Sequence, residues 1–316
     1  VAPSAIGCTH TIAGEFNATG EKIPYDTPRE LKAEELPAIV ELFVAAAKNA
    51  IAAGFDGVEV HGANGYLLDE FTRDSANKRE DAYGGSIEAR AKFPLEVVTA
   101  VVEAVGADRT GYRISPLNSY QDMIDADPSA VTEHLATKLN ELKIAYLHVM
   151  RADFFQQQTG DVVSVARKHF EGVIVVNMGY DLEQGNAAIN DKQADAIAYG
   201  TKFLANPDLV ERFRTGAELN EMRPEFFYVG GNKGYNDYQT LEQIEAAKAV
   251  FKPVKVGAID AANRVFMAPL TRCRADAGHV PSEAMAQHYA DRAGSGLLIA
   301  EATIINEAGS AFLDEP

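Results

Sequence analysis

The sequence predicts an α/β fold built on a parallel sheet, and two observations support this. Short apolar, β-branched runs alternate with stretches of helical apolar spacing, which is the pattern of βαβ units. The chain has 316 residues, of which 47% are hydrophobic, and an α/β barrel of this length can form one domain. We therefore expect a single (β/α)8 TIM-barrel domain over residues 1–316.

The first part of the chain predicts five strands with helices before and between them. Glu34–Ala53 has helical apolar spacing and ends before Gly54, and Asp127 or Ser129 is a suitable cap for a later helix. The other predicted helices are Ser86–Val105, Ser129–Leu142, Val162–His169 and Gln184–Asp191. The predicted strands are Gly57–His61, Thr110–Ser115, Ala145–Met150, Val173–Asn177 and Ala196–Tyr199.

The remainder of the chain predicts two more strands, which makes seven of the eight that a barrel needs. A short helix is expected after Asp208, followed by a Gly- and Tyr-rich stretch, Tyr228–Tyr238. A hairpin is expected within Phe251–Thr271, of the kind that covers the closed end of a barrel. The other predicted elements are helix Leu241–Ala249, strand Val265–Ala268, helix Ser282–Ala293 and strand Leu297–Glu301.

Composition excludes several classes of function. The net charge of −17 argues against nucleic acid or an anionic membrane as the main partner. Cys8 and Cys273 are too few for a disulfide framework and favour a reducing, cytoplasmic location. No apolar run is long enough to span a bilayer. The histidines show no metal-ligand spacing, so no metal is expected.

The segment Gly57–Phe71, GVEVHGANGYLLDEF, carries the strongest chemical signal. Its apolar run predicts a buried strand that ends at His61, and Asn64 and Tyr66 follow closely. Groups that can hold an oxygen or carry a proton thus gather just beyond a strand end, where parallel α/β proteins place their chemistry. Two glycines allow the backbone to turn tightly. A histidine or tyrosine at such a place can also be a scaffold or core residue, and the residues alone leave both interpretations open.

Five motifs are spread along nearly the whole chain. They are HGANGYLLDEF (His61–Phe71), YGGSIEAR (Tyr83–Arg90), RISP with Arg113, FLANPDLVER (Phe203–Arg212) and MAPLTRCRA (Met267–Ala275). In combination they resemble the Old Yellow Enzyme family, which consists of flavin-dependent ene-reductases on a TIM barrel. The resemblance implies FMN as cofactor, NADPH or NADH as hydride donor, and a small activated alkene as substrate. A monomer or homodimer is expected.

The order of the segments differs from that of the family. There, the segment that resembles residues 251–316 lies at the amino terminus, whereas here it follows residues that resemble the carboxyl-terminal region. We therefore expect a circularly permuted barrel, with residues 1–240 as the central and carboxyl-terminal part and residues 241–250 as the joint. The family carries about one further βα unit, with a glutamine and a tryptophan beside the flavin. This sequence shows no such unit, which accounts for seven strands rather than eight.

The resemblance implies a two-step reaction and a role for each residue of the loop. NAD(P)H gives hydride to the flavin, and reduced FMN then gives hydride to the β-carbon of an enone, enal or nitroalkene. Negative charge develops on the substrate oxygen, so donors must hold it, and His61 and Asn64 are implied in this role. Tyr66 is implied as the proton donor to the α-carbon, since a phenol stays protonated at neutral pH.

The flavin ring is expected to contact two further parts of the chain. Thr271 is implied as the hydrogen-bond partner of the flavin C4 carbonyl, beside Pro269, Leu270 and Ala302. A threonine that only caps a strand end is the alternative. Arg113 lies in an apolar strand, where an unpaired charge is costly. The resemblance gives it the N1–C2 edge of the reduced flavin as its partner, and a buried ion pair with a carboxylate is the alternative.

The phosphate of FMN is expected at the ends of two later strands. Gly179 and Gly200 would offer backbone N–H groups, and Thr201 adds a hydroxyl where the family usually has an arginine. The bidentate grip of arginine is thereby lost. Tyr228 resembles a tyrosine that lines the substrate mouth, although it can equally pack the barrel rim.

Three functions compete at this stage. The first is an NAD(P)H-dependent FMN ene-reductase. The second is a truncated, non-catalytic flavin-barrel scaffold that needs a complementing segment, and the absent βα unit favours it. The third is a phosphate-binding barrel lyase or isomerase without flavin. It is disfavoured because it leaves Arg113 and Thr271 without a role and because no lysine lies at a strand end.

Overall fold

The computed structural model describes residues 1–9, 25–228 and 231–301 of the chain. These residues fall into two compact units, Val1–Tyr199 and Gly200–Pro316, and each unit is considered by itself. The single-domain organisation expected from the sequence stays a prediction.

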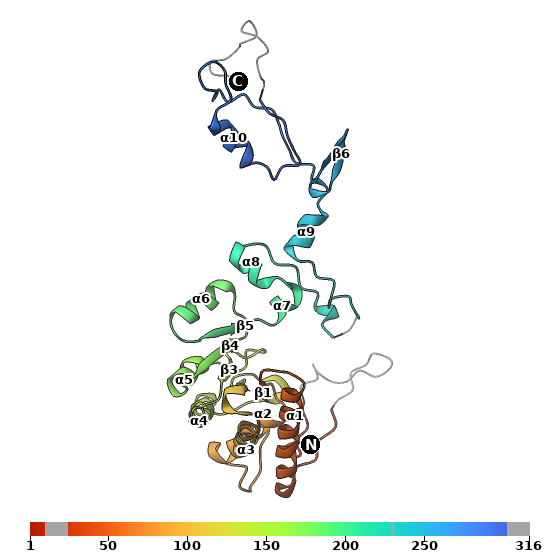
Figure 1. The fold of residues 1–316 in the computed structure, drawn as a ribbon. Helices are drawn as coiled ribbons and strands as arrows, with labels where there is room; N and C mark the ends of the chain where they lie inside the picture. Colours follow the sequence, from red (N-terminus) through yellow and green to blue (C-terminus); the bar gives the residue numbers. More distant parts are fainter. Residues whose placement is uncertain (10–24, 229–230, 302–316) are drawn as a thin grey trace. The chain divides into compact units, whose positions relative to one another are not determined.

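The first unit is built on a five-stranded parallel sheet (Figure 1). Its strand order, β1-β2-β3-β4-β5, follows the sequence, and every neighbouring pair is parallel. All five strands predicted for this part of the chain are confirmed. The strands are β1 (Val58–Gly62), β2 (Thr110–Ile114), β3 (Tyr146–Met150), β4 (Val173–Asn177) and β5 (Ala196–Ala198).

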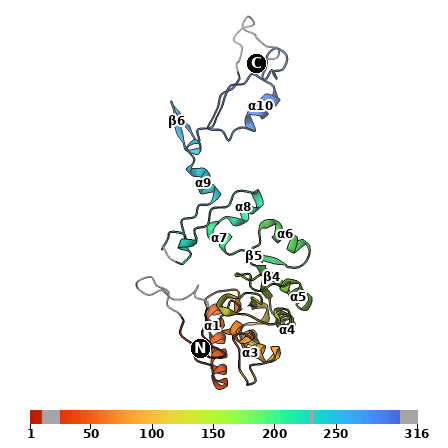
Figure 2. The same ribbon diagram turned by 180° about the vertical axis from the view of Figure 1, so that it is seen from behind.

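Helices fill the crossovers between these parallel strands, and successive helices contact one another, α1 with α3, α3 with α4, and α4 with α5 (Figures 1 and 2). Ser86 and Asp127 cap α3 and α4 by accepting hydrogen bonds from backbone N–H groups of the first turn. The short helix α2 was not expected from the sequence. The helices are α1 (Leu36–Ala52), α2 (Leu67–Thr72), α3 (Ile87–Val105), α4 (Pro128–Glu141), α5 (Val162–His169) and α6 (Leu182–Asn190). The single 3-10 turns in the two units are η2 (Ala33–Glu35), η3 (Ala107–Arg109), η4 (Tyr120–Asp122), η5 (Pro224–Phe226) and η6 (Ala249–Phe251).

The two faces of the sheet differ in chemistry because side chains alternate along each strand. One face supplies the hydrophobic core that packs against the helices, with Tyr112, Leu147 and Ile174 in one register row. The other face carries polar and charged side chains on β1, β2 and β3, among them His61 and Arg113. The fold therefore turns a polar surface away from the helices, and that surface leads to the carboxyl ends of the strands.

The second unit contains the two remaining predicted strands. These form a parallel pair, with the intervening chain carrying a helix, so they make one more βαβ unit. The hairpin expected within Phe251–Thr271 is also present, as an antiparallel pair. The elements are α7 (Thr201–Ala205), α8 (Leu209–Thr215), α9 (Leu241–Ala247), β6 (Val254–Val256), β7 (Ile259–Ala261), β8 (Phe266–Met267), α10 (Glu283–Ala290) and β9 (Leu297–Leu298).

Gly111 gives a direct test of the packing on the polar face of the sheet. A Cβ atom at this position would lie 2.3 Å from Cζ of Tyr146 on the neighbouring strand. Gly111→Ala should therefore lower the free energy of unfolding by about 1–3 kcal/mol, because the ring has to move. Gly160→Ala is the matched control, since its Cβ would meet only Leu117 Cδ2 at 3.4 Å. Urea denaturation measures both, and equal stability of the two variants would contradict this packing.

Candidate active site

Four predicted site residues of the first unit, His61, Asn64, Tyr66 and Arg113, lie on β1 and β2 or just beyond β1. His61 is in register with Arg113 on β2, and Arg113 is in register with His148 on β3. These three side chains therefore form one row across the polar face of the sheet. The loop that carries Asn64 and Tyr66 follows β1 directly, so it lies at the same edge.

The turn after β1 is made by Asn64 and Gly65, whose φ angles are 58° and 71°. Asparagine tolerates this left-handed conformation better than most residues, and glycine adopts it without strain. Gly62 has a different role. A Cβ atom there would lie 2.2 Å from the hydroxyl of Tyr112, so only glycine fits beside that ring. One of the two glycines of the motif thus shapes the turn, and the other allows close packing.

A buried ion pair fastens this turn to the loop after β2. Asp69 Oδ1 accepts from Arg73 Nε at 2.8 Å, with the two side chains only 3% and 1% exposed. The other oxygen, Oδ2, accepts from the backbone N–H of Gly65 at 2.9 Å and from the hydroxyl of Ser115 at 3.3 Å. The Arg73 guanidinium also donates to the carbonyls of Ser115 and Pro116. Both charges are satisfied, and the two loops are held together.

Asn64 is held by two further hydrogen bonds from residues of the loop after β2. Its backbone N–H donates to Ser115 Oγ at 2.7 Å, and its side-chain Oδ1 accepts from Asn118 Nδ2 at 3.0 Å. Asp153, in the loop after β3, accepts from the backbone N–H and the hydroxyl of Ser119. Three consecutive loops are thus linked at the carboxyl end of the sheet.

His61 and Tyr66 lie close together, with ring centroids 5.6 Å apart and ring planes tilted by 52°. His61 is half-buried, whereas Tyr66 is 54% exposed, immediately before α2. Such an exposed tyrosine does not serve the core, which was the structural alternative for Tyr66. The structure brings His61 and Tyr66 together, and Asn64 lies in the same loop after β1.

The imidazole of His61 is held in its neutral form. Burial lowers its pKa, and the positive charge of Arg113 lowers it further. Asp69 and Glu59 act in the opposite direction and His148 in the same direction as Arg113, and the net pKa stays below the ordinary value. Around neutral pH, His61 can therefore donate one hydrogen bond to an oxygen without carrying a charge.

Arg113 has the surroundings of an anion-binding residue. Its Nε is buried and lacks a hydrogen-bond partner within the described ranges. The ion pairs found there also leave Arg113 without a carboxylate partner, so the alternative of a buried ion pair gains no support. An arginine with an unused buried donor at the strand ends fits the negatively charged edge of a reduced flavin.

Two residues of this polar face, Glu59 and His148, were not assigned a functional role from the sequence. His148 Nδ1 lies 2.9 Å from Glu59 Oε2. Burial alone would raise the pKa of Glu59, but the hydrogen bond and charge of His148, with Tyr146 and Arg113, outweigh it and lower the pKa. Glu59 is therefore an anion close to Arg113. The alternation of AYLHVM places His148 on this face, but only the register across strands shows that it adjoins Arg113.

The predicted phosphate residues lie in different units. Gly179 follows β4 in the first unit with a φ of 71°. Its carbonyl accepts from Arg151, whose guanidinium also lies 3.5 Å from the ring centre of Tyr180. Gly200 and Thr201 begin the second unit, with Gly200 preceding helix α7. A Cβ atom at Gly200 would meet nothing within 4 Å.

The other predicted residues of the second unit have varied surroundings. Pro269 and Leu270 are exposed and Thr271 is half-buried, in an irregular segment after β8. Tyr228 is 97% exposed, and the unit gives it no packing role. Ala302 lies outside the described residues.

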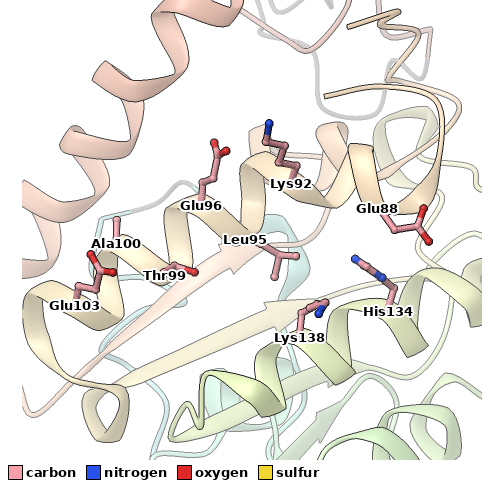
Figure 3. Close-up of a pocket in the computed structure, with 9 residues that line it drawn as sticks. All are labelled: Glu88, Lys92, Leu95, Glu96, Thr99, Ala100, Glu103, His134 and Lys138. Carbon is pink, nitrogen blue, oxygen red and sulfur yellow. The ribbon is translucent and has the colours of Figure 1, made fainter. Parts of the chain in front are cut away.

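A surface groove on the helical side of the sheet is separate from these residues. It lies between α3 and α4 and is lined by polar and charged side chains, including Lys92, Glu96 and His134 (Figure 3). Within the described ranges there is also no group of three or more His, Cys, Asp or Glu residues placed to hold a metal ion. The same residues include no helix long and apolar enough to cross a membrane.

The fold and the site define a parallel α/β protein with a loop of polar side chains and a half-buried arginine at the strand ends. The chain belongs to the NADH:flavin oxidoreductase / NADH oxidase family, whose model matches residues 5–220 and 249–316. This family membership confirms the resemblance found in the sequence and its flavin-dependent oxidoreductase class. The match does not test the permuted order, which stays a prediction.

Two relatives show the extent of the similarity. A protein of Leishmania infantum described as "Probable flavin mononucleotide-dependent alkene reductase" is 52% identical over 239 residues, which are 75% of this chain and 65% of that protein. The rice protein "12-oxophytodienoate reductase 1" is 44% identical over 227 residues, 70% of this chain and 60% of its own length. The chain therefore spans less than two thirds of the length of these two relatives.

Solved structures of related proteins agree with the family membership. The old yellow enzyme from Trypanosoma cruzi is 49% identical, with a TM-score of 0.74 over 76% of this chain and 65% of its own. Morphinone reductase in complex with tetrahydroNAD is 42% identical, with a TM-score of 0.71 over 76% of this chain and 66% of its own. These similarities confirm the predicted barrel class of the fold.

Removal of a positive and of a negative charge near His61 should shift the pKa of His61 in opposite directions. Arg113→Met removes the positive charge that lowers the pKa of His61 most, and should raise this pKa toward 6.5, the ordinary value for a histidine. Glu59→Gln removes a negative charge and should lower the pKa further. Imidazole signals followed by NMR across a pH titration measure both shifts. Shifts of the same sign in the two variants would contradict the proposed charge arrangement.

Proposed function

We propose that this chain is an FMN-dependent ene-reductase that oxidises NADPH or NADH and reduces the activated C=C bond of enones, enals or nitroalkenes. The observation that carries the proposal is the preformed loop of His61, Asn64 and Tyr66 beside Arg113, in a chain of a flavin oxidoreductase family. The names of its relatives support it, since one is described as a "Probable flavin mononucleotide-dependent alkene reductase" and another was solved in complex with tetrahydroNAD.

His61 and Asn64 would hold the carbonyl or nitro oxygen of the substrate. Both are neutral donors, and both are fixed in place, His61 on β1 and Asn64 by its bonds to Ser115 and Asn118. Donors fixed in advance stabilise the negative charge that develops on the oxygen without reorganising during the reaction. Loss of one such donor commonly costs about 10²–10³-fold in rate.

Tyr66 would deliver the proton to the α-carbon. Its ring lies next to His61, one of the two proposed donors to the substrate oxygen. The side chain is half exposed and can reach a ligand without first leaving the core. A neutral phenol is an acid of suitable strength for the basic enolate that forms when hydride reaches the β-carbon.

Arg113 would face the flavin edge, and Thr271, Pro269, Leu270 and Ala302 would contact its ring. Gly179, Gly200 and Thr201 would bind the phosphate, and Tyr228 would line the substrate entrance. When bound, FMN supplies the hydride for the β-carbon. The fit rests on the unused Arg113 donor, because a negatively charged edge would satisfy an Nε that has no other partner among the described residues.

A second function from the sequence analysis is a flavin-barrel scaffold that needs a complementing segment for activity. The two functions differ in a simple assay. An ene-reductase takes up FMN and oxidises NADPH when cyclohexenone is added, whereas a scaffold does not turn over.

Tyr66→Phe tests the proton donor. This variant should keep its rate of FMN reduction by NADPH but lose at least about tenfold in the rate of cyclohexenone reduction, since only the second step needs the proton. Stopped-flow absorbance of the flavin separates the two steps. Tyr235→Phe, a change at an exposed tyrosine of the second unit, is the control. If Tyr66→Phe reduces cyclohexenone as fast as the parent, the assignment of Tyr66 is wrong.

A further inference from the structure

We propose that Asn118 is a positioning residue that fixes the direction of the Asn64 amide, so that Asn64 presents its NH2 group to the substrate oxygen. This inference rests on the proposed function, because it explains how the Asn64 side chain presents a donor rather than an acceptor to the substrate oxygen. Neither the motif nor the charge pattern of the sequence indicates it. Asn118 follows β2 and lies 54 positions from Asn64 in the chain.

The direction of the Asn118 amide is set by a group that can only donate. The backbone N–H of Phe154 donates to Asn118 Oδ1 at 3.3 Å. A backbone N–H has no acceptor function, so the oxygen of Asn118 has to face it. The Nδ2 group of Asn118 therefore faces Asn64, and the 3.0 Å contact between the two side chains is a donation from Nδ2 to Asn64 Oδ1.

The direction of the Asn64 amide follows from this. With its Oδ1 committed to Asn118, its Nδ2 carries the free hydrogen-bonding capacity of the side chain. An amide turned the other way would place two NH2 groups against each other and present an oxygen to the substrate oxygen. The Asn64 amide could present either its oxygen or its NH2 group, and the bond to Asn118 selects the NH2 group. A developing oxyanion needs such a donor.

The surroundings make this arrangement rigid. Asn118 is 3% exposed and its backbone N–H donates to Ser115 at 2.9 Å. Phe154 follows Asp153, whose buried carboxylate accepts from the N–H groups of Ser119, Phe155 and Gln157. The donor-to-acceptor direction of these hydrogen bonds is therefore the same throughout: the loop after β3 donates to the loop after β2, which donates to the loop after β1. Bonds in such a chain polarise and strengthen one another.

The isosteric change Asn118→Asp tests this directly, because a carboxylate can only accept. It keeps the bond from Phe154 but requires a donor from Asn64, so the Asn64 amide must turn. With the FMN-loaded chain and 4-hydroxybenzaldehyde as probe, calorimetry should show at least about a tenfold loss of affinity. Asn118→Ala only releases Asn64 and should lose less. Asn140→Asp is the control for the added charge, since Asn140 Oδ1 accepts from Glu171 N–H on the helical side.

A double-mutant cycle separates positioning from general support of the fold. In the Asn64→Ala background, Asn118→Asp should change the probe affinity less than about threefold, because the residue through which it acts is gone. An equal loss in both backgrounds would overturn the proposal. So would unchanged affinity in Asn118→Asp with Asn64 present. If Asn118→Asp does not fold, the same comparison is made with Asn118→Ala, for which an equal loss in both backgrounds again contradicts the proposal.

One readout needs no flavin and so distinguishes failure of this inference from failure of the proposed function. In the flavin-free chain, the side-chain NH2 protons of Asn118 should exchange slowly with solvent, since they are buried and bonded. Those of Asn64 should exchange quickly, since they face the open site. Side-chain NMR exchange measures both, and slow Asn64 protons beside fast Asn118 protons would show the opposite polarity and contradict the inference.

Discussion

The buried Asp69–Arg73 ion pair holds together the two loops that form the candidate site. Two full charges are almost completely buried one helical turn apart, which is costly unless every lone pair and N–H group is used. Here these groups bond to the loops. Asp69 accepts from Gly65 and Ser115, and Arg73 donates to the backbone carbonyls of Ser115 and Pro116. The turn that holds Asn64 is therefore fixed by the same interactions that satisfy the buried charges. Removal of either residue would leave the other charge buried without a partner and would lower the free energy of unfolding by about 3–5 kcal/mol.

The polar face of the sheet gives the site its electrostatic character. His61, Arg113 and His148 share one register row, with Glu59 below His61 on the same strand. Burial and Arg113 keep His61 neutral, while Glu59 limits how far its pKa falls. A neutral donor next to a fixed positive charge suits an oxygen that becomes negative during the reaction. The same row leaves the buried Nε of Arg113 without a partner in the described residues, and the proposed flavin edge would supply one.

Much of this arrangement was predictable from the sequence. The alternation of apolar runs predicted the seven strands of the parallel pairs, β1–β5, β8 and β9, and the HGANGY motif predicted polar side chains just beyond β1. Contacts between distant segments were not predictable in this way. Nothing near Asn118 in the sequence marks it, because its importance depends on Phe154 and Asn64 lying on either side of it. The role of His148 and Glu59 beside Arg113 was missed for the same reason, since the sequence of one strand does not show how it aligns with the neighbouring strand. Helix α2 was missed because its six residues are too few for a helical pattern to stand out.

We propose that the loop carrying Asn64 and Gly65 is already formed before any ligand binds. Native-state hydrogen exchange of the backbone N–H groups of Asn64 and Gly65 tests it most directly, because these donate to Ser115 Oγ and Asp69 Oδ2. In the ligand-free chain both should exchange as slowly as amides of the core strand β2, and Asp69→Ala should remove the protection at Gly65. Exchange of both amides at the rate of an open loop would contradict a preformed site.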